Sequence, residues 1–450
     1  MDSPPPQALL IVGATMTGPL PWRPALVCLL GIVVTGCSRS VPPVPPRSDV
    51  AATAAATNTT TTSVSRPTSN APSPPWSAAM APVAAGSNRF AIDLYHQLRT
   101  DQDNLFFSPF SILSALSMTA TGARGATLEQ LVGVLHLPAD AEARLAAGDL
   151  GRFYAAADRP FTLATATALW GQSGLAWDEG FRTALAERFG AGFEEADFKS
   201  RPEEERQRIN AWVAARTEGR IGTLLPAGAV SELTRLCLAS AIYFKGNWAE
   251  QFDVAATSPQ PFHRADGTVA EVSLMHRHGR YDHARLNGFQ LLAIPYRGHD
   301  LEMVVLLPEA PQGLSAVDEQ LTAEAILAWR REAERVEVDL WLPRFRLDNG
   351  FEPVRHLEGL GLTDLFRPGT ADLTGMTTNE RLSVSRVLHK AFVVVDEEGT
   401  EAAAATAVIA NAPGPPPPKP VEFRADRPFL FLIRDARHDT ILFLGRFTGP

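Results

Sequence analysis

The chain has 450 residues, of which 45 % are hydrophobic, and a formal net charge of −9 at pH 7. This length allows one large hydrophobic core or two smaller domains. The acidic balance and the lack of Lys/Arg clusters argue against a nucleic-acid-binding protein. Three cysteines cannot form a disulfide framework. Without a Cys-x-x-Cys pair, a thiolate zinc site is not expected either.

The N-terminal segment is similar to a bacterial lipoprotein signal peptide. Arg23 precedes a short apolar run at 25–34, which is too short to span a bilayer comfortably and ends in Val-Thr-Gly-Cys37. We expect residues 1–36 to be removed and Cys37 to be acylated. The alternatives are a plain secretory peptide or a short anchor helix. Because Asp2 and three prolines do not make a positive leader, Met16 is a better start site.

Residues 38–86 are rich in Pro, Ser, Thr and Ala and contain almost no large apolar side chains. Such a segment cannot bury a core, so we expect residues 37–86 to form a disordered tether between a lipid anchor and a folded part at 87–450. Position 38 lacks the aspartate that retains some lipoproteins at the inner membrane. We therefore expect a secreted protein of the bacterial envelope, at the outer membrane or extracellular.

Helix signals dominate the first half of the folded part. Ser87 is a predicted N-cap, and Ser108 followed by Pro109 predicts a helix over 110–119. The other predicted helices cover 128–135 after Thr127, 178–189 and 203–217.

Strand signals dominate the second half. The predicted strands cover 161–170, 233–248, two stretches of 286–308 around a turn at 297–300, 335–347, 382–396, 429–433 and 441–447. Helices followed by strands indicate an α+β fold rather than alternating β-α-β units.

The most informative segment follows the strand that ends near Val395. We call it the hinge segment, and it reads Glu397-Glu398-Gly399-Thr400-Glu401-Ala402-Ala403-Ala404-Ala405-Thr406. On a strand its alternate positions from Thr400 to Thr406 share one face, and all of them are small. A segment that must enter a close-packed sheet needs such side chains, and Gly399 can act as a pivot. The alternative is a Gly/Ala/Pro linker without function.

These residues resemble the hinge and reactive loop of the serpins. Other segments are similar to serpin signatures, and their order and spacing carry the resemblance: 104–112, 241–248, 342–345, 371–376, 389–391 and 423–431. The resemblance implies an α+β serpin fold with three β-sheets, a large central sheet, about eight or nine helices and an exposed reactive loop at about 397–421.

The resemblance also implies a function. A serpin is not an enzyme but a metastable inhibitor of serine endopeptidases that needs no cofactor, and we expect a monomer. The protease cleaves the loop and forms an acyl-enzyme. The hinge then inserts as a new strand, and the protease is trapped. The alternative is a non-inhibitory serpin that acts as a binding or chaperone-like protein. The small residues of the hinge segment favour inhibition.

The cleaved bond lies in a segment without arginine or lysine. Counting from Glu397 by the family's spacing puts the cut between Pro413 and Gly414, whereas counting back from Pro428 puts it near Pro417. We call the candidate positions the reactive-bond segment: Ile409, Ala410, Asn411, Ala412, Pro413 and Gly414. Small and apolar residues there favour an elastase-like or subtilisin-like target protease.

Several residues match family positions that control sheet opening. Ser108, Ser111 and His389 match a hydrogen-bond network under the sheet. Ser240 stands where the family usually has asparagine, and a hydroxyl is shorter than an amide. This predicts a weaker or water-bridged network. The residues expected where the loop enters are Trp248 and the basic–acidic pair of Arg344 with Glu397. The alternative for all of them is ordinary core packing.

Other chemistry finds no support in the motifs. The chain has no Gly-x-Ser-x-Gly elbow and no His-Glu-x-x-His motif. We interpret His276, His278 and His283 as solvated strand histidines rather than as metal ligands, and we expect no metal. Cys237 lies in a strand pattern that is typical of an inert, buried thiol.

Overall fold

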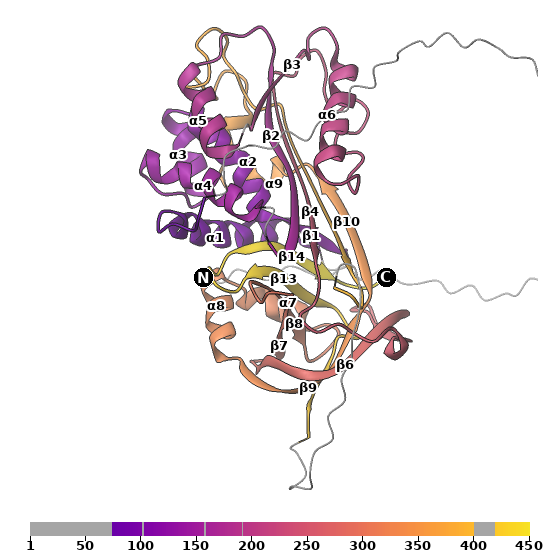
Figure 1. Ribbon diagram of the computed structural model, residues 1–450. Helices are drawn as coiled ribbons and strands as arrows, with labels where there is room; N and C mark the ends of the chain where they lie inside the picture. The colour runs from indigo at the N-terminus through magenta and orange to yellow at the C-terminus, as the bar shows by residue number, and fades with distance from the viewer. Residues whose placement is uncertain (1–73, 101–102, 157–158, 191, 400–418) are drawn as a thin grey trace, which may run out of the picture. The chain divides into compact units, whose positions relative to one another are not determined.

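The computed structural model describes residues 74–100, 103–156, 159–190, 192–399 and 419–450 (Figure 1). Cys37, the reactive-bond segment and positions 400–406 of the hinge segment lie outside the described residues. The described part consists of helices and two hydrogen-bonded sheets, one with five strands and one with nine. Within it, no helix combines the length and the apolarity that a membrane crossing requires.

Helices lie on both faces of the five-stranded sheet, and α7 and α8 pack against strands of the nine-stranded sheet. Figure 1 shows α1 to α5 on one side and α6 on the other. The helices are α1 Met80–Leu98, α2 Pro109–Gly122, α3 Gly125–Val134, α4 Ala141–Tyr154, α5 Glu179–Phe189, α6 Pro202–Arg216, α7 Leu314–Gln320, α8 Ala323–Glu332 and α9 Val354–Gly359.

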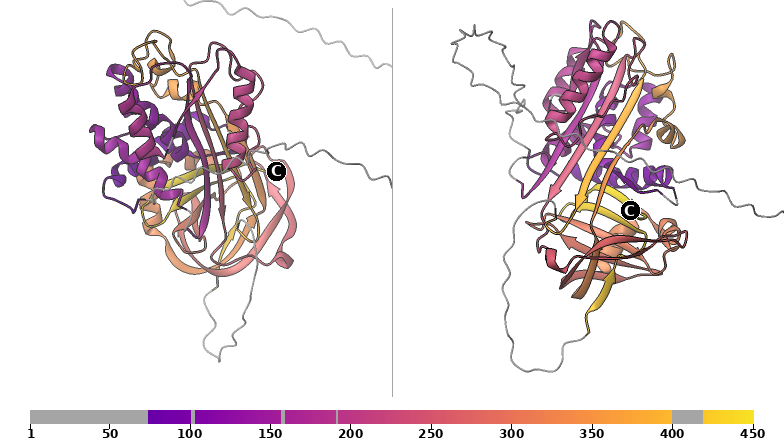
Figure 2. Two further views of the ribbon diagram at one scale, coloured as in Figure 1. Left: turned by 45° about the horizontal axis from the view of Figure 1, so that its top comes forward. Right: turned by 90° about the vertical axis from the view of Figure 1, so that its right-hand side faces the viewer.

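The five-stranded sheet is the central sheet of the fold. Its order is β10 Phe345–Phe351, β11 Arg386–Val395, β4 Leu236–Gly246, β2 Phe161–Gln172 and β3 Phe193–Ala196. β10 pairs with β11, and β2 with β4, in antiparallel fashion, whereas the two inner strands β11 and β4 are parallel (Figure 2). The inner parallel pair is therefore flanked by an antiparallel pair on each side, and the short edge strand β3 is parallel to β2.

The nine-stranded sheet contains the remaining strands. Its order is β1 Leu105–Phe107, β14 Ile441–Phe447, β13 Phe429–Asp435, β8 Leu301–Pro308, β7 Phe289–Pro295, β6 Val269–Arg285, β9 Glu334–Pro343 and β12 Val421–Arg424, with β5 Ser258–His263 also paired to β6. The long strand β6 pairs with β7 near its C-terminal end and with β9 and β5 elsewhere. It thereby joins two strand groups, so the three expected sheets form two continuous hydrogen-bonded ones.

The core has two parts, separated by the central sheet. The larger part fills the space between α1 to α5 and both sheets, and the smaller part lies between the central sheet and α6. There Ile209 and Val213 of α6 share a cluster with alanines of β2 and β4, such as Ala166 and Ala239. Small strand residues let the helix approach closely and exclude water from this face.

Several predicted element ends are confirmed and others are wrong. Ser108 caps α2, as its sequence pattern predicted, and the predicted helix at 178–189 is α5, with Asp178 as its N-cap. Ser87, however, is buried within α1, which begins earlier, because Met80 and Val83 continue the apolar face. Thr127 likewise lies inside α3.

Several larger features were not predicted correctly, among them α7, α8 and α9, for which no helix was predicted. The predicted strand at 335–347 is in fact two strands, β9 and β10, which belong to different sheets. The helix α4 was not predicted, because few of its residues are large and apolar and two glycines interrupt the pattern.

Candidate functional site

The parallel pairing of β4 with β11, which we call the seam, is the unusual feature of the central sheet. Its register runs from Cys237 opposite Arg386 to Tyr243 opposite Phe392. Beyond this point β4 continues to Gly246 and β11 to Val395, but the two strands no longer pair with each other. A parallel pair is slightly less stable than an antiparallel one. A strand that runs opposite to both neighbours could replace it with two antiparallel pairs.

A chain of hydrogen bonds lies under the seam. The backbone N–H of Ser108 donates to His389 Nε2 over 3.1 Å, so the ring proton of His389 is on Nδ1 and faces Ser240 Oγ at 3.1 Å. Ser240 Oγ is 2.6 Å from Ser111 Oγ, which is 3.3 Å from Thr167 Oγ1. These contacts connect His389 through two serine hydroxyls to Thr167.

The imidazole of His389 is neutral at physiological pH. Its side chain is 1 % exposed, and burial lowers its pKa to about 3, although a hydrogen bond with Ser240 opposes the shift. A neutral ring with one donor and one acceptor fits these contacts, because Nε2 accepts from the N–H of Ser108 and the N–H at Nδ1 faces Ser240 Oγ.

The same chain connects the two sides of the seam. His389 belongs to β11 and Ser240 to β4, and both are linked to the start of α2. Ser108 Oγ also accepts from Ser111 N–H and donates to the carbonyl of Leu442 on β14. Ser240 reaches His389 directly, so the shorter hydroxyl does not need a bridging water. Separation of β4 from β11 would break this link.

At the other end of β11, the backbone of the hinge segment is held by the segment after β4. Trp248 Nε1 donates to the carbonyl of Asp396 over 2.9 Å, and Trp248 N–H donates to the carbonyl of Glu398 over 3.2 Å. Phe252 N–H donates to the carbonyl of Glu397 over 2.9 Å. The indole of Trp248 stacks on Tyr296 at 4.6 Å between ring centroids, which fixes its orientation.

The carboxylate of Glu397 is paired although it is almost completely buried. Arg344 donates to Glu397 Oε2 from Nε and Nη2 over 3.1 and 2.5 Å, and Thr257 Oγ1 donates to Oε1 over 2.7 Å. Burial raises the pKa of Glu397, but the hydrogen bonds from Arg344 and Thr257 outweigh it and hold the pKa below its ordinary value. The side chain therefore stays ionised at neutral pH.

Gly399 is the last described residue before the loop, and no other residue type fits its place. Its φ is +104°, and a Cβ atom would lie 2.3 Å from Trp248 N and 2.6 Å from Gly246 O. Both atoms belong to the backbone and cannot move aside. The N–H of Gly399 donates to the carbonyl of Asp396 over 3.2 Å, which closes a turn at the end of β11.

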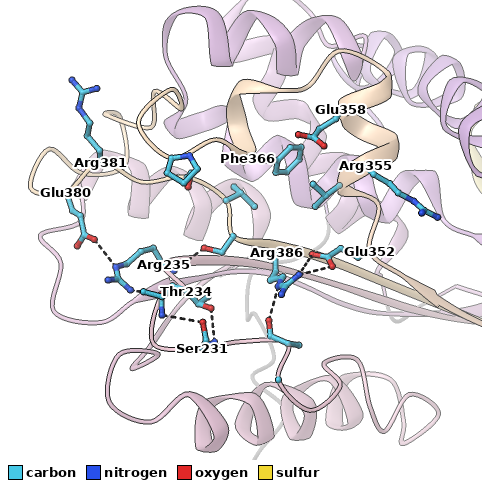
Figure 3. Close-up of a pocket in the computed structure, with 18 residues that line it drawn as sticks. Ser231, Thr234, Arg235, Glu352, Arg355, Glu358, Phe366, Glu380, Arg381 and Arg386 are labelled. Carbon is cyan, nitrogen blue, oxygen red and sulfur yellow. Dashed lines mark hydrogen bonds and ion pairs between the residues drawn. The ribbon is translucent and has the colours of Figure 1, made fainter.

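The opposite end of the seam carries a pocket of 760 Å³ between the starts of β4 and β11 (Figure 3). Arg235 pairs with Glu380 at 2.8 Å, and Arg386 pairs with Glu352 at 3.0 Å. Arg386 Nε also donates to the carbonyl of Ala229, in the segment that follows α6. These contacts hold the seam closed at the end away from Gly399.

The structure therefore gathers the described candidate residues into two clusters. One cluster lies under the seam and contains Ser108, Ser111, Ser240 and His389. The other lies at the end of the seam near Gly399 and contains Trp248, Arg344, Glu397, Glu398 and Gly399. Sequence reasoning missed two partners. Alternation along β2 could have identified Thr167, whereas Thr257 carried no signal.

The candidate metal histidines lie elsewhere. His278 Nδ1 is 2.9 Å from Asp339 Oδ1, and His276 stacks on Trp341. His283 is 3.0 Å from the amide oxygen of Gln290 and is buried, not solvated as predicted. Among the described residues, no cluster of His, Cys, Asp or Glu is arranged to hold a metal ion.

Known proteins with similar sequences and structures place this site in a family. Residues 85–450 match the family model "Serpin (serine protease inhibitor)". The chain is 38 % identical to antithrombin-III of Mus musculus over 384 residues, which cover 82 % of each chain. It is 39 % identical to the leukocyte elastase inhibitor of Bos taurus over 381 residues, or 82 % of this chain and 100 % of that one.

Solved structures agree with the sequence matches. Uncleaved ovalbumin superposes with a TM-score of 0.74 at 25 % identity, over 82 % of this chain and 100 % of ovalbumin. Serpin48 from the insect Tenebrio molitor gives a TM-score of 0.72 at 28 % identity, over 82 % and 98 %. The chain therefore belongs to the serpin family of serine protease inhibitors, as the residues of its hinge segment indicated.

Proposed function

We propose that this protein traps a serine endopeptidase by inserting its cleaved loop between β4 and β11. The observation that supports the proposal most is the seam, where two parallel inner strands meet and each has an antiparallel neighbour on its other side. The chain leaves β11 through a turn that ends at Gly399, beside the ends of β4 and β11 that do not pair with each other. A segment that continues from this turn into the seam runs opposite to β11 and β4.

Insertion would release enough free energy to drive the trap. A strand of roughly a dozen residues forms hydrogen bonds on both sides, each worth about 0.5–1.5 kcal/mol net. With the apolar burial of its inner face, the total is on the order of 10–20 kcal/mol. The small side chains at Thr400, Ala402, Ala404 and Thr406 suit this role, because larger ones would collide with the helices that cover the sheet.

The covalent chemistry belongs to the protease. Its serine attacks the carbonyl of the reactive bond, the peptide bond breaks, and the new amine leaves with the C-terminal part of the loop. The N-terminal part stays bound as an ester. Insertion then competes with hydrolysis of this ester by water, so fast insertion gives a trapped complex and slow insertion gives a cleaved substrate.

We infer that the target is an elastase-like or subtilisin-like protease. The reactive-bond segment contains Ile409, Ala410 and Ala412 but no arginine or lysine. A protease that prefers small or apolar residues accepts this sequence, and a trypsin-like protease does not. The similarity to a protein named leukocyte elastase inhibitor supports the same class.

The test is a protease panel with a matched variant. We expect wild-type protein to form a complex with an elastase-like or subtilisin-like enzyme that survives SDS, and to form none with trypsin. Thr400→Arg should be cleaved without complex formation, because insertion would bury an unpaired charge. Cleavage of wild-type protein by every protease without a stable complex would support the alternative, a non-inhibitory binding or chaperone-like serpin.

We propose further that the protein is a lipoprotein of a bacterial envelope, with Cys37 as the acylated residue. The support is the apolar run at 25–34, the Val-Thr-Gly-Cys ending and the segment rich in Pro, Ser, Thr and Ala between Cys37 and α1. Expressed in a bacterial host, wild-type protein should partition into detergent, because acyl chains bind membranes strongly. Cys37→Ala should remain in the aqueous phase. If both forms stay in the aqueous phase, simple secretion replaces lipidation, and if both enter the detergent phase, an anchor helix replaces it.

A further inference from the structure

One edge of the central sheet is left open and borders a cavity. β3 pairs with β2 only from Leu169 to Gln172, so the stretch of β2 from Phe161 to Ala168 has β4 on one side and no strand on the other among the described residues. A cavity of 250 Å³ lies against this edge, and its walls come from α2, α4, β2 and the ends of α5 and α6. It is separate from the seam.

The charged side chains that line this cavity are all positive among the described residues. None of the described residues that line it carries a carboxylate, whereas Arg152 and Arg216 carry a positive charge. Arg152 is engaged with the carbonyl of Glu187 and with Asp149. The cavity therefore has a positive wall without an acidic side chain of its own.

Arg216 has no carboxylate partner among the described residues. Its guanidinium carbon lies 4.4 Å from the centre of the Trp212 ring, and no carboxylate of the described residues lies within 4.0 Å. Burial lowers the pKa of Arg216, and the more distant charge of Glu194 does not offset this effect. Its favourable electrostatic contacts are thus the indole face and the C-terminal end of α6.

Further hydrogen-bond donors belong to the same walls. The indole N–H of Trp212 is buried and has no acceptor among the described residues. The N–H of Leu169 donates to the carbonyl of Gly192, which shows that odd-numbered residues of β2 turn their backbone groups toward the open edge. Leu163 and Thr165 therefore present backbone N–H groups, together with their carbonyls, on the side of the cavity.

The cavity also has apolar side chains in its walls, beside the hydroxyls of Ser114, Thr165 and Thr167. Phe110 and Met118 of α2 and Phe189 of α5 line it opposite the polar groups. A ligand for this site needs an anionic head and a compact apolar body. The volume lies just below the usual range of small-molecule sites, which begins at about 300 Å³, so the ligand must be small.

We propose that this cavity binds a small carboxylic acid with an apolar body of about one ring. The carboxylate is held by Arg216, whose planar guanidinium can donate two parallel hydrogen bonds. The ring packs against Phe110, Met118 and Phe189. A neutral ligand of the same shape would leave the guanidinium unpaired.

The experiment compares benzoate with benzamide, which has the same shape and no charge. In calorimetric titration of the full chain at low salt, we expect benzoate to bind at one site and benzamide to bind at least tenfold more weakly. Arg216→Gln should weaken benzoate binding by about 10–100-fold, the range for a hydrogen bond to a charged group. Arg208→Gln is the matched control, because Arg208 also lies on α6 over a tryptophan but pairs with Glu205.

A second variant blocks the cavity without changing its charge. A Cβ atom at Gly151 would lie 3.6 Å from Ser114 Oγ, an ordinary contact, so Gly151→Leu places its side chain at the cavity wall. We expect it to abolish benzoate binding while circular dichroism stays unchanged. Gly151→Leu tests benzoate binding in this cavity if Arg216→Gln does not fold. Equal binding of benzamide, an unchanged affinity in Arg216→Gln or in folded Gly151→Leu, or no binding of benzoate at millimolar concentration would overturn the proposal.

Discussion

Arg344 and Glu397 form an ion pair at the point where the chain leaves the central sheet. Arg344 lies between β9 and β10, and Glu397 follows β11, so the pair links the end of β11 to a neighbouring part of the fold. Glu397 is 3 % exposed, whereas the arginine is half exposed. The pair is therefore accessible to change without damage to the core.

Removal of this pair should weaken the closed state of the sheet. We expect Arg344→Gln to destabilise the native form by about 1–3 kcal/mol, because a buried carboxylate loses its charged donor. Its inhibitory activity should decay faster at 37 °C, as the hinge segment enters the seam without cleavage. The double variant with Glu397→Gln should lose less than the sum of the two single changes. Strict additivity would show that the two residues act independently.

Acid should weaken the protein through His389. The pKa of this histidine is about 3 when folded and 6.5 in its ordinary state, so the unfolded chain binds more protons between these values. Stability is therefore complete above pH 6.5 and falls as the pH drops toward 3, by up to about 1.4 kcal/mol per pH unit.

Urea unfolding at several pH values between 6.5 and 4.5 measures this contribution. The window lies above the ordinary pKa of Glu397, whose depressed pKa produces a loss only at lower pH. His389→Gln should show a shallower dependence than wild type. Parallel curves for the two proteins would exclude His389 as the source.

Ser240 should matter more than another buried serine nearby. Ser240→Ala leaves the ring N–H of His389 without its acceptor and should cost about 1–3 kcal/mol. Ser117 is the matched control, because its hydroxyl is buried and has no partner among the described residues. Ser117→Ala should cost clearly less in urea unfolding. Similar losses at both sites would mean that the hydrogen-bond chain contributes little.

The turn before the loop should tolerate only glycine. Gly399→Ala combines a positive φ with collisions against backbone atoms of 246–248. Gly361→Ala is the control, because Gly361 has a φ of +108° and no atom within 4 Å of a new Cβ. The control should lose about 1–3 kcal/mol from strain alone, and Gly399→Ala should lose more and show impaired complex formation. Equal losses would remove the steric argument for Gly399.

Local signals were predictable from the sequence, whereas most contacts between distant segments were not. The cap at Ser108 depends on a few neighbouring residues, and so does the small-residue pattern of the hinge segment. The parallel register of β4 and β11 depends on the packing of the whole sheet, which no local pattern encodes. No local pattern encodes the contact of Thr257 with Glu397 either. Nor does one encode the break between β9 and β10, which follow each other in one apolar stretch but belong to different sheets.

The thermal midpoint of the loop-cleaved protein tests the central claim most directly. The loop is cut between Ala407 and Gly414 with a protease that is not trapped, and the midpoint is compared with that of intact protein. Insertion into the seam should raise it by more than about 10 °C, given a release of about 10–20 kcal/mol. Cleaved Thr400→Arg should show little or no rise, because its charge blocks insertion. An unchanged or lower midpoint for cleaved wild-type protein would contradict insertion between β4 and β11.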